Sequence, residues 1–359
     1  MARRIMGKTD KIRVLIVDDS AFMRKIIGDI LREDPIMEIV GKARNANEAM
    51  EMTKSLSPDV ITLDIEMPGK SGLEALEEIM EYKPVPVVMV SSLTKSGANV
   101  TMQALDIGAV DFVTKPSDSA SIDMAKIGAE LRRKVIEASM AAVHRKWSQK
   151  TANNISQPCS VPPRKDAIRP KPEMLVIAAS TGGPMALQQV IPSLPANFPL
   201  PVLLVQHMPP GFTTSFSQRL NEQSNLTVIE GCDGMPVRKG TVIVAPGGFH
   251  LVLERKGAEF VCRLTETPPV RSVRPSADVL FNSVAENVGG NVLVLVLTGM
   301  GKDGLDGTRA LRDKGAYVIA ESRETSVIFG MPGAIVGAGL ADEVLPLYSI
   351  ASGIERVAR

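Results

Sequence analysis

The feature that most constrains the fold is a series of short apolar runs that do not alternate with polar residues. In the first third of the chain these runs are IRVLIV at 12–17, VITL at 60–63 and VPVVMV at 85–90, followed by DFVTKP at 111–116. Strands of a parallel sheet are buried on both faces and therefore form continuous apolar runs. The segments 20–31 and 72–80 between them have apolar residues at helical spacing. This alternation predicts a doubly wound, flavodoxin-like α/β domain of about 120 residues.

The same pattern returns later in the chain, after a break. A helical pattern over 121–147 leads into a polar stretch with five prolines at 148–173, which is typical of a flexible linker. Further buried-strand runs lie at 174–179, 201–206, 292–297 and 317–321, with helical patterns at 211–224 and 350–359. Three strand-like segments, at 241–246, 250–255 and 259–264, predict a β-rich insert. The expected fold class is α/β with two doubly wound parallel-sheet domains, the second a Rossmann-like three-layer α/β/α domain.

Composition excludes several classes of partner. Lys and Arg number 41 against 40 Asp and Glu, which argues against a nucleic-acid or anionic-membrane footprint. No apolar run approaches the roughly 18 residues of a spanning helix, and the basic N-terminus lacks the apolar core of a secretory signal. The three cysteines show no disulfide or metal spacing. We therefore expect a cytoplasmic protein with no nucleic-acid partner and no direct membrane insertion.

Polar residues end four successive predicted strands of the first domain. Asp18 and Asp19 end one strand and Asp64 another, while Ser91 and Lys115 end the last two. Ligands of open parallel sheets bind at this edge, and three carboxylates there repel one another unless a cation such as Mg²⁺ is bound. The alternative is that these residues only terminate strands as turn formers. Their recurrence on four strand ends favours a binding pocket.

At this point the first domain resembles the receiver domain of two-component response regulators, from residue 11 to about residue 130. The resemblance implies that Asp64 is the phosphoacceptor, and that Ser91 and Lys115 bind the phosphoryl group. It implies Phe112 as the switching aromatic. It also implies a Mg²⁺ cofactor whose site is formed by Asp18, Asp19, Asp64 and the Glu66 carbonyl.

A serine, a histidine and an aspartate fall on strand ends of the second domain. Ser180 ends the run MLVIAA within MLVIAASTGGPM, His207 follows VLLVQ, and Asp303 lies in the glycine-rich turn after VLVLVL. A serine hydroxyl needs an adjacent base to act as a nucleophile, and these three could serve as nucleophile, general base and orienting acid. The other two histidines have weaker claims: His144 lies on the helical pattern after the first domain, and His250 opens a strand away from any clear parallel strand end.

Two other readings of AASTGG remain open from the residues alone. Ser180 could simply cap a helix, or the glycine turn could bind a phosphate at a helix N-terminus. The phosphate-binding loop GxxxxGK[ST] requires a lysine that is missing here, and Ala178 replaces the first glycine of the hydrolase elbow GxSxG. These two failures favour a distinct class of serine hydrolase.

Longer motifs strengthen that interpretation. STGGP, QHMPPGFTTSFSQRLN, VAPGGFHL, RPSADVLF and LTGMGKDGLDG follow a receiver-like domain in this order. Together they resemble the chemotaxis protein-glutamate methylesterase family, CheB, over nearly the whole chain outside the linker and the first ten residues. Ala178 departs from the glycine more usual in that family. The resemblance implies a receiver at 11–130, a helix and Pro-rich linker at 131–173 and a methylesterase domain at 174–359.

The resemblance also assigns roles in catalysis. It implies the triad Ser180, His207 and Asp303, with Thr181 and the Met300 N–H at the oxyanion site and Arg274 and Ser276 on a substrate-facing loop. The implied substrates are glutamate γ-methyl esters, and in some members glutamines, of chemoreceptors. A chemotaxis histidine kinase is the implied phosphodonor, and phosphorylation the implied activator. The rival hypothesis is a response regulator whose second domain only binds a partner or nucleotide.

Overall fold

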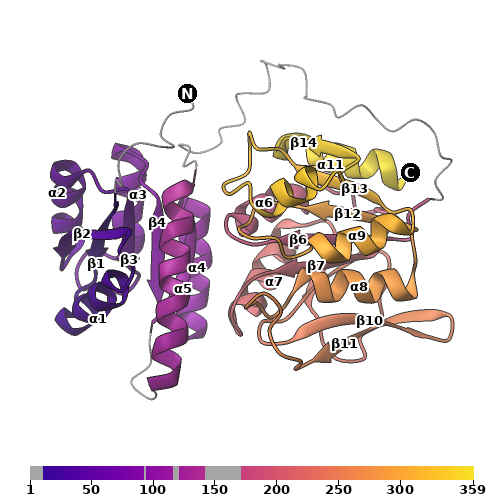
Figure 1. Ribbon diagram of the computed structural model, residues 1–359, viewed down its shortest axis with the longest axis horizontal. Helices are drawn as coiled ribbons and strands as arrows, with labels where there is room; N and C mark the ends of the chain where they lie inside the picture. The colour runs from indigo at the N-terminus through magenta and orange to yellow at the C-terminus, as the bar shows by residue number, and fades with distance from the viewer. Residues whose placement is uncertain (1–10, 93, 116–120, 142–170) are drawn as a thin grey trace. The chain divides into compact units, whose positions relative to one another are not determined.

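The computed structural model describes residues 11–92, 94–115, 121–141 and 171–359. The chain divides into two compact units, Met1–Trp147 and Ser148–Arg359, called here the N-terminal and C-terminal units (Figure 1). The end of the helical pattern predicted to 147, with His144 and Trp147, and most of the predicted linker lie outside the described residues.

The N-terminal unit is built on a parallel sheet of five strands in the order β2-β1-β3-β4-β5. The strands are β1 (Ile12–Val17), β2 (Met37–Ala43), β3 (Val60–Asp64), β4 (Val87–Ser91) and β5 (Asp111–Thr114). Strands β3 and β4 are buried along their whole length because helices cover both faces of the sheet. The parallel α/β fold predicted from the unbroken apolar runs is confirmed.

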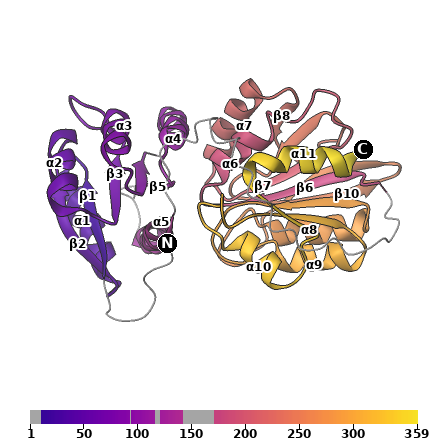
Figure 2. The ribbon, with the colours of Figure 1, turned by 90° about the horizontal axis from the view of Figure 1, so that it is seen from above.

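The helices around this sheet, in the part of the unit that the structure describes, are α1 (Ala21–Arg32), α2 (Ala46–Leu56), α3 (Gly72–Tyr82), α4 (Lys95–Ile107) and α5 (Ser121–Met140). Helices α1 and α5 pack together on one face, and α2, α3 and α4 follow one another on the other (Figure 2). The first four helices begin at a Ser, Asn or Thr whose side chain accepts a backbone N–H three residues on. These caps fix where each helix starts, just beyond the strand that precedes it.

Helix α5 extends past residue 130, where the sequence placed the end of the first domain. Lys134 lies on this extension, and its Nζ is 2.9 Å from Asp111 Oδ1 and also donates to the Phe112 carbonyl. The residues after 130 as far as Met140 are therefore packed as part of the N-terminal unit.

The C-terminal unit contains a parallel sheet of seven strands in the order β14-β13-β12-β6-β7-β9-β8. These are β6 (Met174–Ala179), β7 (Val202–Gln206), β8 (Thr227–Glu230), β9 (Thr241–Val244), β12 (Val292–Val296), β13 (Tyr317–Glu321) and β14 (Glu343–Leu345). Strand β9 pairs in parallel with β7 and β8. Its segment therefore belongs to the main sheet and not to the predicted insert, because TVIV is an apolar run that needs cover on both faces.

The insert consists of one antiparallel hairpin, β10 (His250–Lys256) and β11 (Glu259–Thr265). Within residues 171–359 the helices are α6 (Gly183–Val190), α7 (Phe212–Gln223), α8 (Ala277–Asn287), α9 (Leu305–Asp313), α10 (Met331–Gly337) and α11 (Leu347–Ala358). Helices α6, α7 and α11 cover one face of the sheet, and α8, α9 and α10 the other (Figure 2). The hairpin packs against α8, so it extends the α8 side of the three-layer structure.

The sheet order reverses direction at β6, which has β12 on one side and β7 on the other. In open parallel sheets the loops that diverge at such a switch point leave a crevice where ligands bind. Among the described helices, none has the length and hydropathy that a membrane-spanning segment requires.

Candidate functional sites

Ser180 lies in the turn that joins β6 to α6. Its N–H donates to the Thr298 carbonyl at 3.0 Å, and its own carbonyl accepts the Gly183 N–H at 2.7 Å. The first bond ties Ser180 to the neighbouring strand end, and the second closes the turn. Ser180 is the first residue after six fully buried residues of β6, which places its side chain at the switch-point edge.

Two glycines allow this turn to form so close to its neighbours. Gly182 has a φ of +78°, and a Cβ at this position would lie 2.6 Å from Val327 Cβ. At Gly299, in the loop after β12, a Cβ would lie 2.7 Å from Ser180 Cβ. Only glycine satisfies both the backbone angle at the first and the close approach at the second.

His207 and Asp303 meet at the same edge. His207 follows β7 and Asp303 lies between β12 and α9, and His207 Nε2 is 2.8 Å from Asp303 Oδ2. A carboxylate can only accept, so Nε2 carries a hydrogen, and in the neutral ring Nδ1 keeps its lone pair. The structure therefore brings together the predicted base and the predicted orienting acid, from the two strands that flank β6.

Asp303 is nearly fully buried in a nest of donors. The Ser276 hydroxyl donates to Oδ1 at 2.7 Å, the Ala277 N–H to Oδ2 at 2.6 Å, and the Asp278 N–H to Oδ1 at 3.2 Å. Burial by itself would raise the pKa of Asp303, but the hydrogen bond and charge of His207, with the bonds from Ser276 and Ala277, lower that pKa to about 2. Asp303 is therefore ionised at neutral pH, and it accepts hydrogen bonds from the N–H groups in the first turn of α8 that have no partner within the helix.

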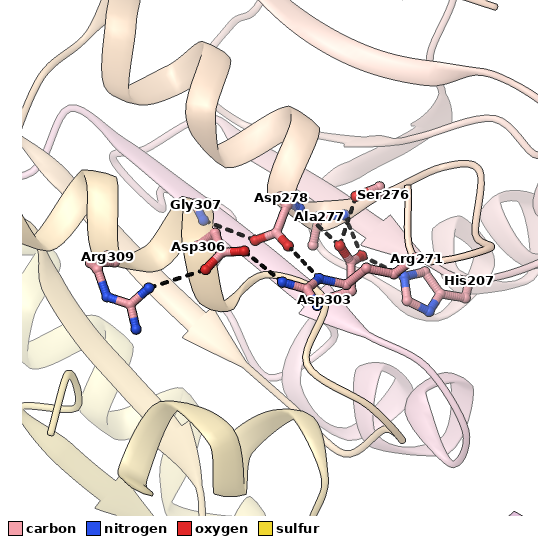
Figure 3. A network of polar contacts seen from close by, with 9 residues as sticks. All are labelled: His207, Arg271, Ser276, Ala277, Asp278, Asp303, Asp306, Gly307 and Arg309. Carbon is pink, nitrogen blue, oxygen red and sulfur yellow. Dashed lines mark hydrogen bonds and ion pairs between the residues drawn. The ribbon is translucent and has the colours of Figure 1, made fainter. Parts of the chain in front are cut away.

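A network of ion pairs extends from this nest, as Figure 3 shows. Asp278 accepts the Gly307 N–H and lies 3.2 Å from Arg271 Nε, and Arg271 also pairs with Asp306. Burial raises the pKa of Asp278, as does the nearby charge of Asp303. The network connects the N-terminus of α8 to the N-terminus of α9, and so fixes the position of Asp303, which lies beside both.

The loops that carry Ser180 and His207 are also joined to each other through hydrogen bonds from Gln206. The Gln206 amide donates from Nε2 to the carbonyls of Ser180 at 3.0 Å and His207 at 3.1 Å. Ser180 Oγ itself makes no hydrogen bond with any described residue. In free enzymes the bond between nucleophile and base commonly tightens only when substrate binds.

A second buried carboxyl supports the serine turn from the other side. Glu321, the last residue of β13, accepts the Thr298 N–H at 2.8 Å and the Thr325 hydroxyl at 2.9 Å. Burial raises the pKa of Glu321 to about 7. Thr298 in turn binds the Ser180 N–H through its carbonyl and the Thr181 carbonyl through its hydroxyl. Glu321 thus anchors the residue that holds the Ser180 turn.

The residues expected at the oxyanion and substrate positions lie in different surroundings. Thr181 is buried, and Met300 is half-buried in the glycine-rich loop; no described residue accepts a hydrogen bond from the Met300 N–H. Arg274 donates to the carbonyls of Glu266 and Thr267, in the loop that precedes it. Ser276 is fully buried and directed at Asp303. Its contacts are those of a residue that orients Asp303, not of one that faces a substrate.

In the N-terminal unit the predicted acidic pocket comes together at the carboxyl edge of the sheet. Oxygens of Asp18, Asp19 and Asp64 lie within 4.8 Å of one another. Lys115 Nζ is 2.7 Å from Asp64 Oδ2 and 3.6 Å from Asp18 Oδ2. Burial raises the pKa of Asp64 to about 6, and it also raises that of Asp18, although Lys115 opposes both shifts. Three carboxylates facing one lysine leave an excess of negative charge.

The donor set of this pocket fits a hard divalent cation. Asp18 Oδ2 is buried and accepts no hydrogen bond from the residues that the structure describes. Oxygen ligands at this spacing, with one carboxylate exposed to water, are those that Mg²⁺ prefers. Arg24 braces the pocket from outside by donating to the carbonyls of Asp18 and Asp19.

Ser91, Phe112 and Glu66 are the other residues predicted to belong to the site of the N-terminal unit. Ser91 is buried at the end of β4, and its hydroxyl accepts from Thr101 Oγ1 at 2.8 Å. The Phe112 ring is buried, with Lys134 Nζ 4.8 Å from its centre. The Glu66 N–H donates to Asp64 Oδ1 at 3.1 Å, so the turn after β3 wraps the Asp64 side chain.

Several supporting residues were not singled out from the sequence. Gln206 and Glu321 each end an otherwise apolar buried run, which is the same signal that revealed Asp64 and Ser91. Thr298 directly follows the run VLVLVL and has the same signal, whereas Arg271 has none because it ends no apolar run.

The fold and sites together define a class of protein, a response-regulator-like unit joined to an α/β hydrolytic unit. Family models match both parts in this order: the response regulator receiver domain over residues 14–125 and CheB methylesterase over residues 175–354. The chain belongs to the CheB methylesterase family, and is thus a hydrolase of chemotaxis with a receiver domain. This confirms the family resemblance, the α/β fold class and the enzyme class predicted from the sequence.

Similar proteins support the assignment along nearly the full chain. A protein-glutamate methylesterase/protein-glutamine glutaminase of Geobacillus kaustophilus is 47% identical over 344 residues, covering 96% of this chain and 97% of that one. The protein of the same name from Thermotoga maritima is 44% identical over 343 residues, covering 95% and 97%. The crystal structure of the Thermotoga maritima CheB methylesterase catalytic domain matches with 43% identity and a TM-score of 0.51, covering 52% of this chain and 99% of that chain.

Proposed function

We propose that the C-terminal unit hydrolyses γ-methyl esters of glutamate on chemoreceptors with Ser180 as the nucleophile, His207 as the general base and Asp303 as the orienting acid. The observation that carries this proposal is the 2.8 Å contact between His207 and Asp303 beside the β6 turn that bears Ser180. The same acyl-enzyme chemistry accepts a glutamine side chain, with ammonia in place of methanol as the leaving product.

The tautomer of His207 determines the first step. Its Nε2–H is held by the ionised Asp303, so Nδ1 is the nitrogen that takes the proton from Ser180 Oγ as the oxygen attacks the ester carbonyl. The Met300 N–H, with Thr181 beside Ser180, is the proposed donor to the oxyanion. His207 then gives its proton to the departing methoxide oxygen, which leaves as methanol, and a γ-glutamyl ester of Ser180 remains. A water deprotonated by His207 hydrolyses that ester and restores the enzyme.

In the N-terminal unit we assign Asp64 as the phosphoacceptor, with a chemotaxis histidine kinase as its phosphodonor. Asp18, Asp19, Asp64 and the Glu66 carbonyl would hold Mg²⁺, which when bound offsets the negative charge of the incoming phosphoryl group. Lys115 supplies a fixed positive charge to the phosphoryl oxygens, and Ser91 a hydroxyl. Phosphorylation then regulates the esterase through rearrangement of Ser91 and Phe112.

The decisive experiment measures methanol release from methylated receptor membranes, with and without a small phosphodonor. The wild-type chain should release methanol faster with the phosphodonor, and a serine-directed phosphonate should label Ser180 and stop the reaction. A chain that releases no methanol and takes up no phosphonate would support the rival hypothesis of a binding domain.

A further inference from the structure

His250 opens strand β10 of the hairpin and is completely buried. Both of its ring nitrogens have partners: Nδ1 lies 3.1 Å from the Ser276 N–H, and Nε2 lies 3.2 Å from the Pro268 carbonyl. A carbonyl only accepts and a backbone N–H only donates, so the ring is neutral with its hydrogen on Nε2. Burial lowers the pKa of His250, as does the nearby Arg274, and this keeps the ring in that form.

The bond between Nδ1 and Ser276 connects His250 to the proposed orienting acid. The Ser276 N–H donates to His250, and the Ser276 hydroxyl donates to Asp303 Oδ1 at 2.7 Å. Asp303 Oδ2 in turn holds His207 at 2.8 Å. Figure 3 shows the last part of this chain, with the carboxylate of Asp303 between Ser276 and the ring of His207. His250 is therefore linked to the base through two intervening residues.

The Ser276 hydroxyl has an alternative partner at the N-terminus of its own helix. Ser276 stands at the N-cap of α8, where a serine side chain ordinarily accepts an N–H of the first helical turn. Here that bond is absent, and the N–H groups of Ala277 and Asp278 go to Asp303 instead. If the backbone of Ser276 rotated, its hydroxyl could cap helix α8. Asp303 would then lose both the hydroxyl donor and the N–H donors of the first helical turn.

We propose that His250 is a positioning residue of the esterase site, which fixes the Ser276 backbone so that the serine hydroxyl and the first turn of α8 point at Asp303. The inference rests on the proposed triad. It gives a function to the histidine of the VAPGGFHL motif, which makes no hydrogen bond with the described residues of the triad itself. The bond from Nε2 to Pro268 fixes the ring while Nδ1 binds Ser276, so both nitrogens are needed.

The test measures kcat and KM for methanol release from methylated receptor membranes by the full chain. His250→Leu removes both bonds and should lower kcat by about 10- to 100-fold, because a small displacement of a catalytic group has effects of that size. KM should change less than twofold, since His250 does not line the reacting groups. His250→Asn keeps an acceptor near the position of Nδ1 and should recover a large part of the lost kcat.

Ser283→Ala is the matched control. The Ser283 hydroxyl accepts the Leu253 N–H at 2.9 Å and so joins the same two elements, β10 and α8, away from Asp303. The melting temperature of this variant should fall, as that of His250→Leu should, but its kcat should not change. If Ser283→Ala and His250→Leu lower kcat equally, His250 is only part of the packing and the proposal is overturned.

A double substitution tests the route through Ser276. Ser276→Ala and His250→Leu act on one chain of bonds, so the double variant should be no slower than the slower single variant. Multiplied losses would show that the two residues act independently and would contradict the proposal. A wild-type chain that neither releases methanol nor reacts with the phosphonate would instead refute the proposed function, so the two failures are distinguishable.

Discussion

Two buried aspartates at the carboxyl edges of two parallel sheets, Asp64 at the end of β3 and Asp303 in the loop after β12, have pKa values shifted in opposite directions. The pKa of Asp64 is raised to about 6 and that of Asp303 lowered to about 2. Asp64 faces the like charge of Asp18 and has Lys115 and the Glu66 N–H against it, whereas Asp303 receives hydrogen bonds from His207, Ser276 and Ala277. Burial raises the pKa in both places, so the difference comes from the donors around each group.

This contrast matches the chemistry proposed for the two sites. A pocket with excess negative charge attracts a cation and then a phosphoryl group, while a permanently ionised carboxylate orients an imidazole and stabilises its protonated form. The fold places a carboxylate at the carboxyl edge of the sheet in both units. The neighbouring donors set the pKa of that carboxylate and therefore the chemistry it suits.

The largest expected effect is that of substituting Ser180, because only the proposed esterase site, and not the proposed phosphorylation site, carries out the hydrolysis. Ser180→Ala removes the nucleophile and should lower methanol release by at least about 10⁴-fold. Ser193→Ala, an exposed serine of the same unit whose hydroxyl bonds the Gln189 carbonyl, is the control and should behave as wild type. A Ser180→Ala enzyme at the wild-type rate would remove Ser180 from the mechanism.

A slightly smaller loss should follow when the orienting carboxylate becomes an amide. Asp303→Asn can no longer hold the Nε2–H tautomer of His207 by charge, and kcat should fall by about 10³- to 10⁴-fold. Asp306→Asn alters the exposed end of the same network and should change kcat less than threefold. Equal, small effects of both substitutions would mean that Asp303 serves the helix α8 terminus alone.

The regulatory aspartate should behave differently in the same assay. Asp64→Ala should leave the basal esterase rate within about twofold and abolish its stimulation by a small phosphodonor, because no acceptor oxygen remains. Asp59→Ala, just before the other end of β3, removes the carboxylate that binds the Arg13 N–H and should retain stimulation. Stimulation of Asp64→Ala to the wild-type extent would contradict the switch.

The smallest effect concerns stability and a third buried carboxyl. The pKa of Glu321 is about 7 in the folded protein against an ordinary value of 4.5. The folded state therefore holds a proton that the unfolded state releases, and Glu321 lowers stability as pH rises from 4.5 through 7. Glu321→Gln removes this dependence while keeping an acceptor for the Thr298 N–H.

We expect Glu321→Gln to raise the free energy of unfolding relative to wild type by roughly 1–3 kcal/mol more at pH 8 than at pH 5. Urea unfolding of both proteins at the two pH values measures the difference. If the gain is the same at both, Glu321 does not titrate in that window. A loss at pH 8 would show that the ionised form stabilises the Ser180 turn.

Much of the fold could be predicted from hydrophobic pattern. Buried runs such as VLLVQ and VLVLVL identified the parallel strands, and the position of Ser180, His207 and Asp303 after three of them brought the three residues to one edge. The pattern was wrong for the segment of β9, because an apolar run of four residues does not tell which sheet it joins. The other two segments predicted for the β-rich insert do form it, as the hairpin β10–β11.

The sequence by itself determined the elements, the strand-end residues and the family, because periodicity and local motifs are properties of neighbouring positions. Only the tertiary structure decided which groups surround each carboxylate. His250, Ser276 and Asp303 are 26 and 27 residues apart along the chain, yet they form one series of hydrogen bonds. Acidity depends on contacts within a few ångströms in space, so the same residue type became a phosphoacceptor candidate in one unit and an orienting acid in the other.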